Sequence, residues 1–167
     1  MTLEQLLFSR DARNVRQAEL LRQFAGRTLV CLTVVLPGSV KRDKRSLRIA
    51  EAGVAAVRAE FSPVFEELRD LETGFEGFFI VDGGAWEVKR RCCRIEDTHP
   101  LGRLMDIDVL EDRDGFPVPL GRRVLALPQR PCILCGAPVR ICMRTRAHTP
   151  EELLLKIDEI LKNTANS

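Results

Sequence analysis

Two aspartates separated by a single residue offer the clearest chemistry in this chain. Asp106 and Asp108 lie in the segment 99–109, which reads HPLGRLMDIDV. In a β-strand, residues two apart project from the same face, so these carboxylates would stand side by side while their neighbours point into the core. Paired carboxylates suit a hard divalent cation such as Mg²⁺, which bridges to substrate phosphates, and His99 and Arg103 are close enough in sequence to face the same phosphates. A half-exposed strand with an acidic outer face would show the same spacing.

Three cysteines and one histidine form a second candidate site. Cys132, Cys135, Cys142 and His148 lie within 17 residues, and they match a structural zinc site in the kind and number of ligands. A Cys-x-x-Cys pair chelates because its short loop lets both sulfurs approach one ion. Two other interpretations stay open, namely small buried cysteines that pack as hydrophobic side chains, or a redox pair.

The same part of the chain is rich in arginine. Between Gly121 and His148 there is no acidic residue, and the arginines are Arg122, Arg123, Arg130, Arg140, Arg144 and Arg146. Such a run is typical of a site for phosphate or another polyanion, although a solvated surface loop could have the same composition.

A third candidate site follows an apolar run. Residues 28–36 (TLVCLTVVL) predict a buried strand, which Pro37 and Gly38 end. Ligands settle at the carboxyl ends of strands in open α/β sheets, glycine permits close approach of the backbone, and Lys41 could reach a phosphate. The residue order of a P-loop is absent, and a turn before a basic helix start would give the same pattern.

The elements that must position these residues follow from hydrophobic periodicity and capping signals. Helices are predicted over 2–24, 44–61, 85–97 (with Trp86 inward) and from Pro150, and strands over 28–36, 64–71, 75–81, 103–110 and 118–126, with a hairpin turn at Asp114-Gly115. The order β-α-β-β-α-β between residues 28 and 110 predicts an α+β fold, with a ferredoxin-like sheet, flanking N- and C-terminal helices and an added hairpin.

Length and composition narrow the classes of protein. A chain of 167 residues fits one domain, here 1–167, and 45% hydrophobic residues are typical of a globular protein. The net charge of +2 and 5% aromatic residues argue against nucleic-acid binding. The N-terminus has no signal-peptide pattern and no apolar stretch is long enough to span a bilayer, so we expect a cytoplasmic protein without a membrane partner and with reduced cysteines.

Several of these segments together resemble one family, the apo-citrate lyase phosphoribosyl-dephospho-CoA transferases, also called citrate lyase holo-acyl-carrier-protein synthases. The resemblance spans nearly the whole chain, and the block from His99 to Asp108 is its most specific part. Met105 stands where an aromatic residue is commoner, and residues 61–86 carry no matching signature. The matching residues are Ser9-Arg10-Asp11, Arg13, Gln17, Thr33-Val34-Val35, Pro37-Gly38, Lys41, Gly53, His99-Pro100-Leu101-Gly102-Arg103-Leu104, Asp106-Ile107-Asp108-Val109-Leu110, Pro131-Cys132, Cys135, Cys142, Arg144 and His148.

The resemblance implies a reaction and roles for these residues. The 2'-(5''-phosphoribosyl)-3'-dephospho-CoA group would pass from its triphosphate precursor to a serine of the citrate lyase acyl-carrier subunit, with release of pyrophosphate. Asp106 and Asp108 would hold Mg²⁺, and His99, His148 or a carboxylate would accept the serine proton. The residues that would bind or clamp the substrate are Arg103, Arg10, Arg13, Pro37, Gly38, Lys41, Arg144, Arg146 and His148.

Two alternatives stay open at this point. One is the equivalent transferase that serves the carrier of malonate decarboxylase, which would share the chemistry and differ in its partner. The other, from a different class, is a zinc-stabilised module that binds nucleic acid or protein. In that case the arginine run would make the contacts, although Pro128, Pro131 and Pro138 interrupt it and it contains no aromatic residue for base stacking.

Overall fold

The structure is a computed structural model, and it describes residues 2–165. Its helices and strands follow the chain in the order α1 (Leu3–Gln23), β1 (Thr28–Val34), α2 (Lys44–Phe61), β2 (Phe65–Leu71), β3 (Gly74–Val81), α3 (Ala85–Thr98), β4 (Met105–Arg113), β5 (Phe116–Pro119), α4 (Val139–Thr145) and α5 (Pro150–Ala165). Short 3₁₀ helices cover Gly102–Leu104 and Arg122–Leu125.

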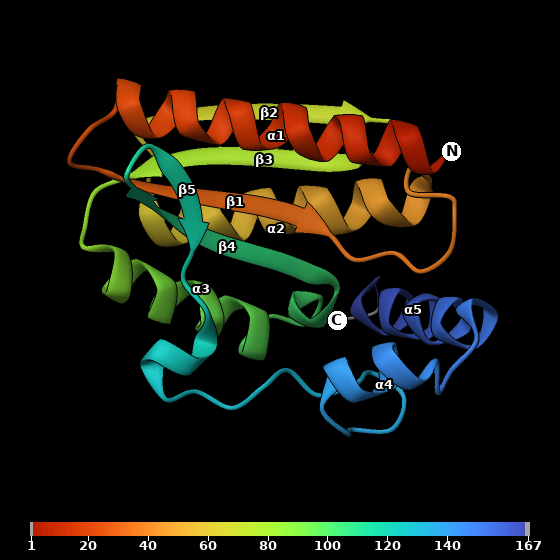
Figure 1. Cartoon of the computed structure of the whole chain (residues 1–167). Coiled ribbons are helices and arrows are strands. Elements are labelled where there is room, and N and C mark those ends of the chain that lie inside the picture. Colours follow the sequence, from red (N-terminus) through yellow and green to blue (C-terminus); the bar gives the residue numbers. More distant parts are fainter. Residues whose placement is uncertain (1, 166–167) are drawn as a thin grey trace.

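The strands form one antiparallel sheet in the order β2-β3-β1-β4-β5. This arrangement confirms the predicted α+β fold, and the order of the first four strands is consistent with a ferredoxin-like sheet. In Figure 1, α1 crosses one face of the sheet and α2 lies behind the other, while α4 and α5 lie together at one end. Among the described residues, no helix is both long and apolar enough to cross a membrane.

The two faces of the sheet carry separate apolar clusters. On one face, Leu32 of β1 and Ile107 of β4 pack with α2, α3 and the Ile157 side chain of α5. On the other face, Leu20 and Leu21 of α1 cover side chains from the central strands.

Local signals determine most of the element boundaries. Thr2 and Gln5 form the predicted capping box of α1, and Thr149 and Glu152 form another at the start of α5. The hairpin between β4 and β5 turns at Asp114 and Gly115, whose φ angles of 54° and 86° are those a two-residue turn of this type requires.

Three predictions about the elements are wrong. Trp86 is 54% exposed rather than inward, because the buried face of α3 contains Val88, Cys92 and Ile95, and a residue two positions before Val88 lies on the opposite side of the helix. Strand β4 begins at Met105 and not at residue 103, because residues 102–104 form a 3₁₀ turn. Glycine is required in this turn, since a Cβ on Gly102 would lie 2.4 Å from the Ile95 carbonyl oxygen.

The third error concerns the end of the sheet. Strand β5 ends at Pro119, while a strand was expected over 118–126. The chain leaves the sheet after the Leu120 amide donates to the Val109 carbonyl oxygen, and residues 122–125 then form a 3₁₀ helix. The short helix α4 was not predicted.

Candidate active site and metal cluster

Asp106 and Asp108 project from the same face of β4, as predicted. Their side chains are 47% and 48% exposed, while Met105, Ile107 and Val109 point into the core. Each aspartate lies opposite a residue of β1, with Thr33 beside Asp106 and Cys31 beside Asp108. The carboxylates therefore lie on the face of the sheet that α1 covers, on the part of β4 that has no partner strand on its outer side.

The outer edge of β4 lacks a partner strand over residues 105–109, because β5 pairs only with Leu110–Arg113. Side chains take the place of a strand at Ile107. The Ile107 amide donates to Glu96 Oε1 at 2.9 Å, and its carbonyl oxygen accepts from Lys89 Nζ at 2.9 Å. Both side chains belong to α3 and are almost fully buried. Two charged groups therefore provide the hydrogen bonds that the buried backbone of this edge would otherwise lack.

A cavity of about 230 Å³ opens at this edge, and both aspartates line it. Arg130 Nη1 lies 3.1 Å from Asp106 Oδ1, and Lys89 Nζ lies 3.7 Å from Asp108 Oδ1. Partial burial, with a further contribution from the Asp108 charge, raises the pKa of Asp106 despite the opposing effect of Arg130. The other cationic and amide side chains of the wall are those of Arg122, Arg123, Gln129 and Arg140.

The arginines of this wall came from the run that the sequence singled out, but Lys89 and Glu96 were missed. They occupy the same face of α3 as Val88, Cys92 and Ile95. Charged residues on the apolar face of a helix are a signal that sequence reasoning could have used, because a buried charge needs a partner. Arg122 also has an internal role, since its guanidinium binds Glu96 Oε2 at 2.7 Å and Asp97 Oδ1 at 2.8 Å.

Two residues predicted to be catalytic lie outside the lining of this cavity. His99 follows α3, and its Nδ1 accepts the Leu101 amide at 3.0 Å. Burial lowers the pKa of His99, so the ring is neutral near pH 7. Arg103 turns its guanidinium toward the carbonyl oxygen of Pro131. His99 therefore holds the backbone of the turn that leads into β4, and Arg103 joins this turn to the segment at Pro131.

A second cavity, of about 640 Å³, lies between the first half of α1, the loop 39–42 and the hairpin of β2 and β3. Lys41 lines it, and burial together with the nearby charge of Arg10 lowers the pKa of Lys41. The Lys41 ammonium donates to the Leu36 carbonyl oxygen, across the turn that Pro37 and Gly38 make. Gly38 has a φ of 79° there, which favours glycine.

Arg13 and Glu76 lie between the two cavities. Arg13 Nη1 is 3.6 Å from Glu76 Oε1, and Glu76 lines the larger cavity. Glu76, Thr33 and Asp106 are direct cross-strand neighbours on β3, β1 and β4. One row of side chains therefore runs from the larger cavity to the smaller one, and burial raises the pKa of Glu76 within it.

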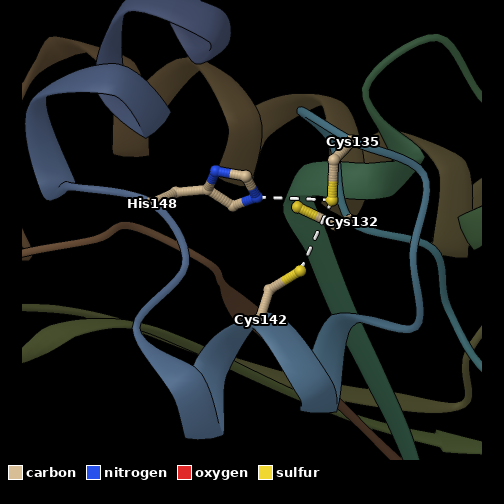
Figure 2. Close-up of side chains that lie close together, drawn as sticks. All are labelled: Cys132, Cys135, Cys142 and His148. Carbon is tan, nitrogen blue, oxygen red and sulfur yellow. Dashed lines mark hydrogen bonds between the residues drawn. The ribbon is translucent and has the colours of Figure 1, made fainter.

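Figure 2 shows Cys132, Cys135, Cys142 and His148 pointing toward one another. Their potential ligand atoms all lie within 4.8 Å of one another. Cys135 Sγ is 3.5 Å from Cys142 Sγ and 3.3 Å from His148 Nε2. A zinc ion with Zn–S bonds of about 2.3 Å would hold tetrahedral sulfur ligands roughly 3.8 Å apart. The residues therefore fit a four-ligand metal site, which is one of the three interpretations that the sequence left open.

The position of His148 in the cysteine cluster does not fit the substrate-binding role that was also predicted for this residue. Its imidazole faces the cysteine sulfurs rather than either cavity. Arg144, in α4, and Arg146, which follows that helix with a φ of 51°, are exposed. Neither arginine is among the residues that line the two cavities within the described part of the chain.

Comparison with known proteins identifies the chain as a transferase. The sequence model of the family described as apo-citrate lyase phosphoribosyl-dephospho-CoA transferase matches residues 1–164. A protein of that name from Citrobacter koseri is 35% identical over 173 residues, covering 100% of this chain and 92% of the relative. Two relatives named as probable members come from Vibrio cholerae serotype O1, 37% identical over 96% of this chain and 91% of the relative, and Streptococcus pyogenes serotype M18, 30% identical over 98% and 87%.

The chain belongs to the apo-citrate lyase phosphoribosyl-dephospho-CoA transferase family. It is therefore an enzyme that acts in the attachment of the citrate lyase prosthetic group.

Proposed function

We propose that this enzyme transfers the 2'-(5''-phosphoribosyl)-3'-dephospho-CoA group from its triphosphate precursor to a serine of the apo acyl-carrier subunit of citrate lyase, releasing pyrophosphate. The description of the family names both the prosthetic group and citrate lyase. The observation that supports the chemistry is the pair Asp106 and Asp108 in the lining of a cavity that arginine and lysine side chains also line.

The acceptor serine is the nucleophile in this reaction, so the protein must mainly stabilise charge. Negative charge develops on the departing pyrophosphate, and preorganised cations stabilise it best where water is partly excluded. Arg123 and Arg140 line the cavity and can donate to phosphate oxygens there, while Arg130, which is bonded to Asp106 and to backbone, adds positive charge to the wall. Lys41, Arg10 and Arg13 lie at or beside the larger cavity, which suits them to the rest of the nucleotide.

Asp106 and Asp108 are the residues that would hold Mg²⁺. The raised pKa of Asp106 supports this role, because a carboxylate beside a second carboxylate is stabilised by an added cation. Magnesium would neutralise charge on the phosphate oxygens at the reacting phosphorus. Neither His99 nor His148 lines the cavity, which favours one of the two aspartates as the group that accepts the serine proton.

We propose zinc as the ion of the cysteine cluster. Three thiolates and one imidazole are ligands that zinc prefers, and four protein ligands leave no open position for catalysis. The ion would then be structural.

The experiment is incubation of the purified protein with Mg²⁺, labelled triphosphate precursor and apo carrier, followed by detection of labelled carrier and pyrophosphate. We expect transfer to the citrate lyase carrier. Labelling of the malonate decarboxylase carrier alone would instead assign the related transferase activity. No transfer to either carrier, with retention of nucleic acid on the protein, would favour the binding-module alternative.

Asp106→Asn and Asp108→Asn test the proposed roles of the two aspartates. Each should lower transfer about 100-fold or more, because the amide keeps the shape of the carboxyl but cannot neutralise a cation. Glu111→Gln is the matched control, since Glu111 lies on the same strand outside the cavity and should change little. Full activity in either aspartate variant would remove that residue from the mechanism.

A further inference from the structure

The segment 121–149 folds with almost no apolar core of its own. From Gly121 to Thr149 the only buried residues are Cys132 and Cys142, and both belong to the cluster of three cysteines and His148. Ile133 adds one partly buried contact with the main core. Burial of apolar side chains cannot offset the conformational entropy of ordering so long a segment, so another interaction must stabilise it.

The two cysteines of the Cys-x-x-Cys pair sit in a tight hairpin. Cys132 donates its amide to the Ala137 carbonyl oxygen at 2.7 Å and accepts the Gly136 amide at 3.0 Å. Val139 then donates its amide to the Arg130 carbonyl oxygen at 2.9 Å. The hairpin thus closes between residues 130 and 139, and a metal bound at its tip would fix the backbone of Arg130 at its base.

Side chains connect the base of this hairpin to the aspartate site in both directions. Arg130 reaches the start of β4, where it contacts Asp106 Oδ1 at 3.1 Å and donates to the carbonyl oxygens of Gly102 and Arg103 at 3.3 and 3.2 Å. Arg103 reaches back and donates to the Pro131 carbonyl oxygen. Arg103 and Arg130 therefore join the hairpin of residues 130–139, which carries Cys132 and Cys135, to the strand that carries Asp106.

We propose that the metal ion in the Cys132, Cys135, Cys142 and His148 cluster positions Arg130 against Asp106, so that metal binding completes the wall of the active-site cavity. Arg130 acts as the link, and the cluster ligands act through it without touching the substrate. The effect of the metal on transfer rests on the proposed function, whereas its effect on the order of residues 121–149 does not.

Zinc content and proteolysis test the structural half of the proposal. We expect about one zinc ion per chain in the wild-type protein. Cys142→Ser should lose it and expose residues 121–149 to trypsin, which cleaves at arginine, about tenfold faster or more. Met143→Ser is the matched control, since Met143 follows Cys142 on α4 but is 73% exposed. A wild-type protein without metal, or one with a disulfide between Cys135 and Cys142, would overturn the proposal.

Variants of His148 test whether this residue is a metal ligand or a residue that binds substrate. His148→Ala should lose zinc and most of the transfer activity. His148→Cys should restore both, because a fourth thiolate replaces the imidazole in a zinc site. Zinc bound to the His148→Cys variant without recovery of transfer would contradict a role limited to the metal.

A double-mutant cycle tests the path through Arg130. If the metal acts by placing Arg130, then His148→Ala should reduce transfer far less in the Arg130→Ala background than in the wild-type protein. Independent, multiplying losses would show that the cluster acts on the site by another route. Absence of transfer in the wild-type protein, with zinc binding and protease resistance as expected, would contradict the proposed function and leave the ordering role of the metal in place.

Discussion

The carboxyl group of Asp106 lies between a cation and a like charge. Arg130 is 3.1 Å away and Asp108 shares the same strand face. Partial burial and Asp108 together outweigh Arg130, so the pKa of Asp106 is raised. The fold therefore disfavours the ionised form of Asp106. Such a carboxyl is typical of a functional site, where a bound cation would stabilise the ionised form.

A stability measurement checks this balance. Because the pKa of Asp106 is higher in the folded than in the unfolded chain, its ionised form costs folding free energy at neutral pH, and this cost disappears as the pH falls through the folded pKa. Asp106→Asn should therefore unfold at a higher temperature than the wild-type protein near neutral pH, with a difference that shrinks in acid.

Asp70→Asn is the control of opposite sign. The guanidinium of Arg42 lowers the pKa of the exposed Asp70, so this carboxylate stabilises the fold at neutral pH and loses that effect in acid. Thermal unfolding at several pH values compares the two variants. A loss of stability in Asp106→Asn near neutral pH would show that the contact with Arg130 dominates.

At the scale of elements, the open edge of β4 determines where the site can form. A fifth strand that paired along the whole of β4 would cover residues 105–109 and close the cavity. Strand β5 instead pairs with the last four residues of β4 and leaves. Lys89 and Glu96 bond to the buried backbone groups of Ile107 that no strand pairs, and they leave the aspartate side of the edge accessible.

Glu96 is expected to be the stabilising residue of this edge. Glu96→Ala would leave the Ile107 amide unpaired and remove a buried partner of Arg122, so we expect a loss of about 2–4 kcal/mol in the free energy of unfolding. Asp97→Ala removes the half-exposed partner of the same arginine and should cost no more than about 1 kcal/mol. Urea denaturation measures both, and equal losses would contradict the role assigned to the edge.

At the scale of the whole molecule, the arginine run divides into two groups. Arg122 and Arg130 bind carboxylates and backbone within the protein. Arg123, Arg140, Arg144 and Arg146 are exposed. We expect the exposed group to attract an acidic carrier protein to the side of the molecule that holds α4, close to the cavity at β4.

Ionic strength tests this expectation. Raising salt from about 0.05 M to about 0.3 M should weaken carrier binding several-fold, because exposed charges are screened over roughly a Debye length. Arg123→Glu with Arg144→Glu should weaken binding and reduce the salt dependence, whereas Arg90→Glu, an exposed arginine of α3, should not. Carrier affinity that is insensitive to the double reversal would place the docking surface elsewhere.

The sequence alone determined the local features of this protein. Capping boxes at Thr2 and Thr149, the helix over 44–61, the turn at Asp114-Gly115 and the shared face of Asp106 and Asp108 all depend on interactions between residues close in the chain. The family resemblance carried by the block around His99 is also a property of sequence, and the family match confirms it.

Tertiary structure decided which distant groups meet. Lys89 and Glu96 reach Ile107 only because α3 packs beside the open edge of β4, and Arg130 meets Asp106 only because the hairpin before α4 folds against the start of that strand. His148 could have faced phosphate or metal by sequence, and the fold turns it to the three cysteines. These contacts depend on how elements pack across long sequence separations, where spacing along the chain carries no information about distance in space.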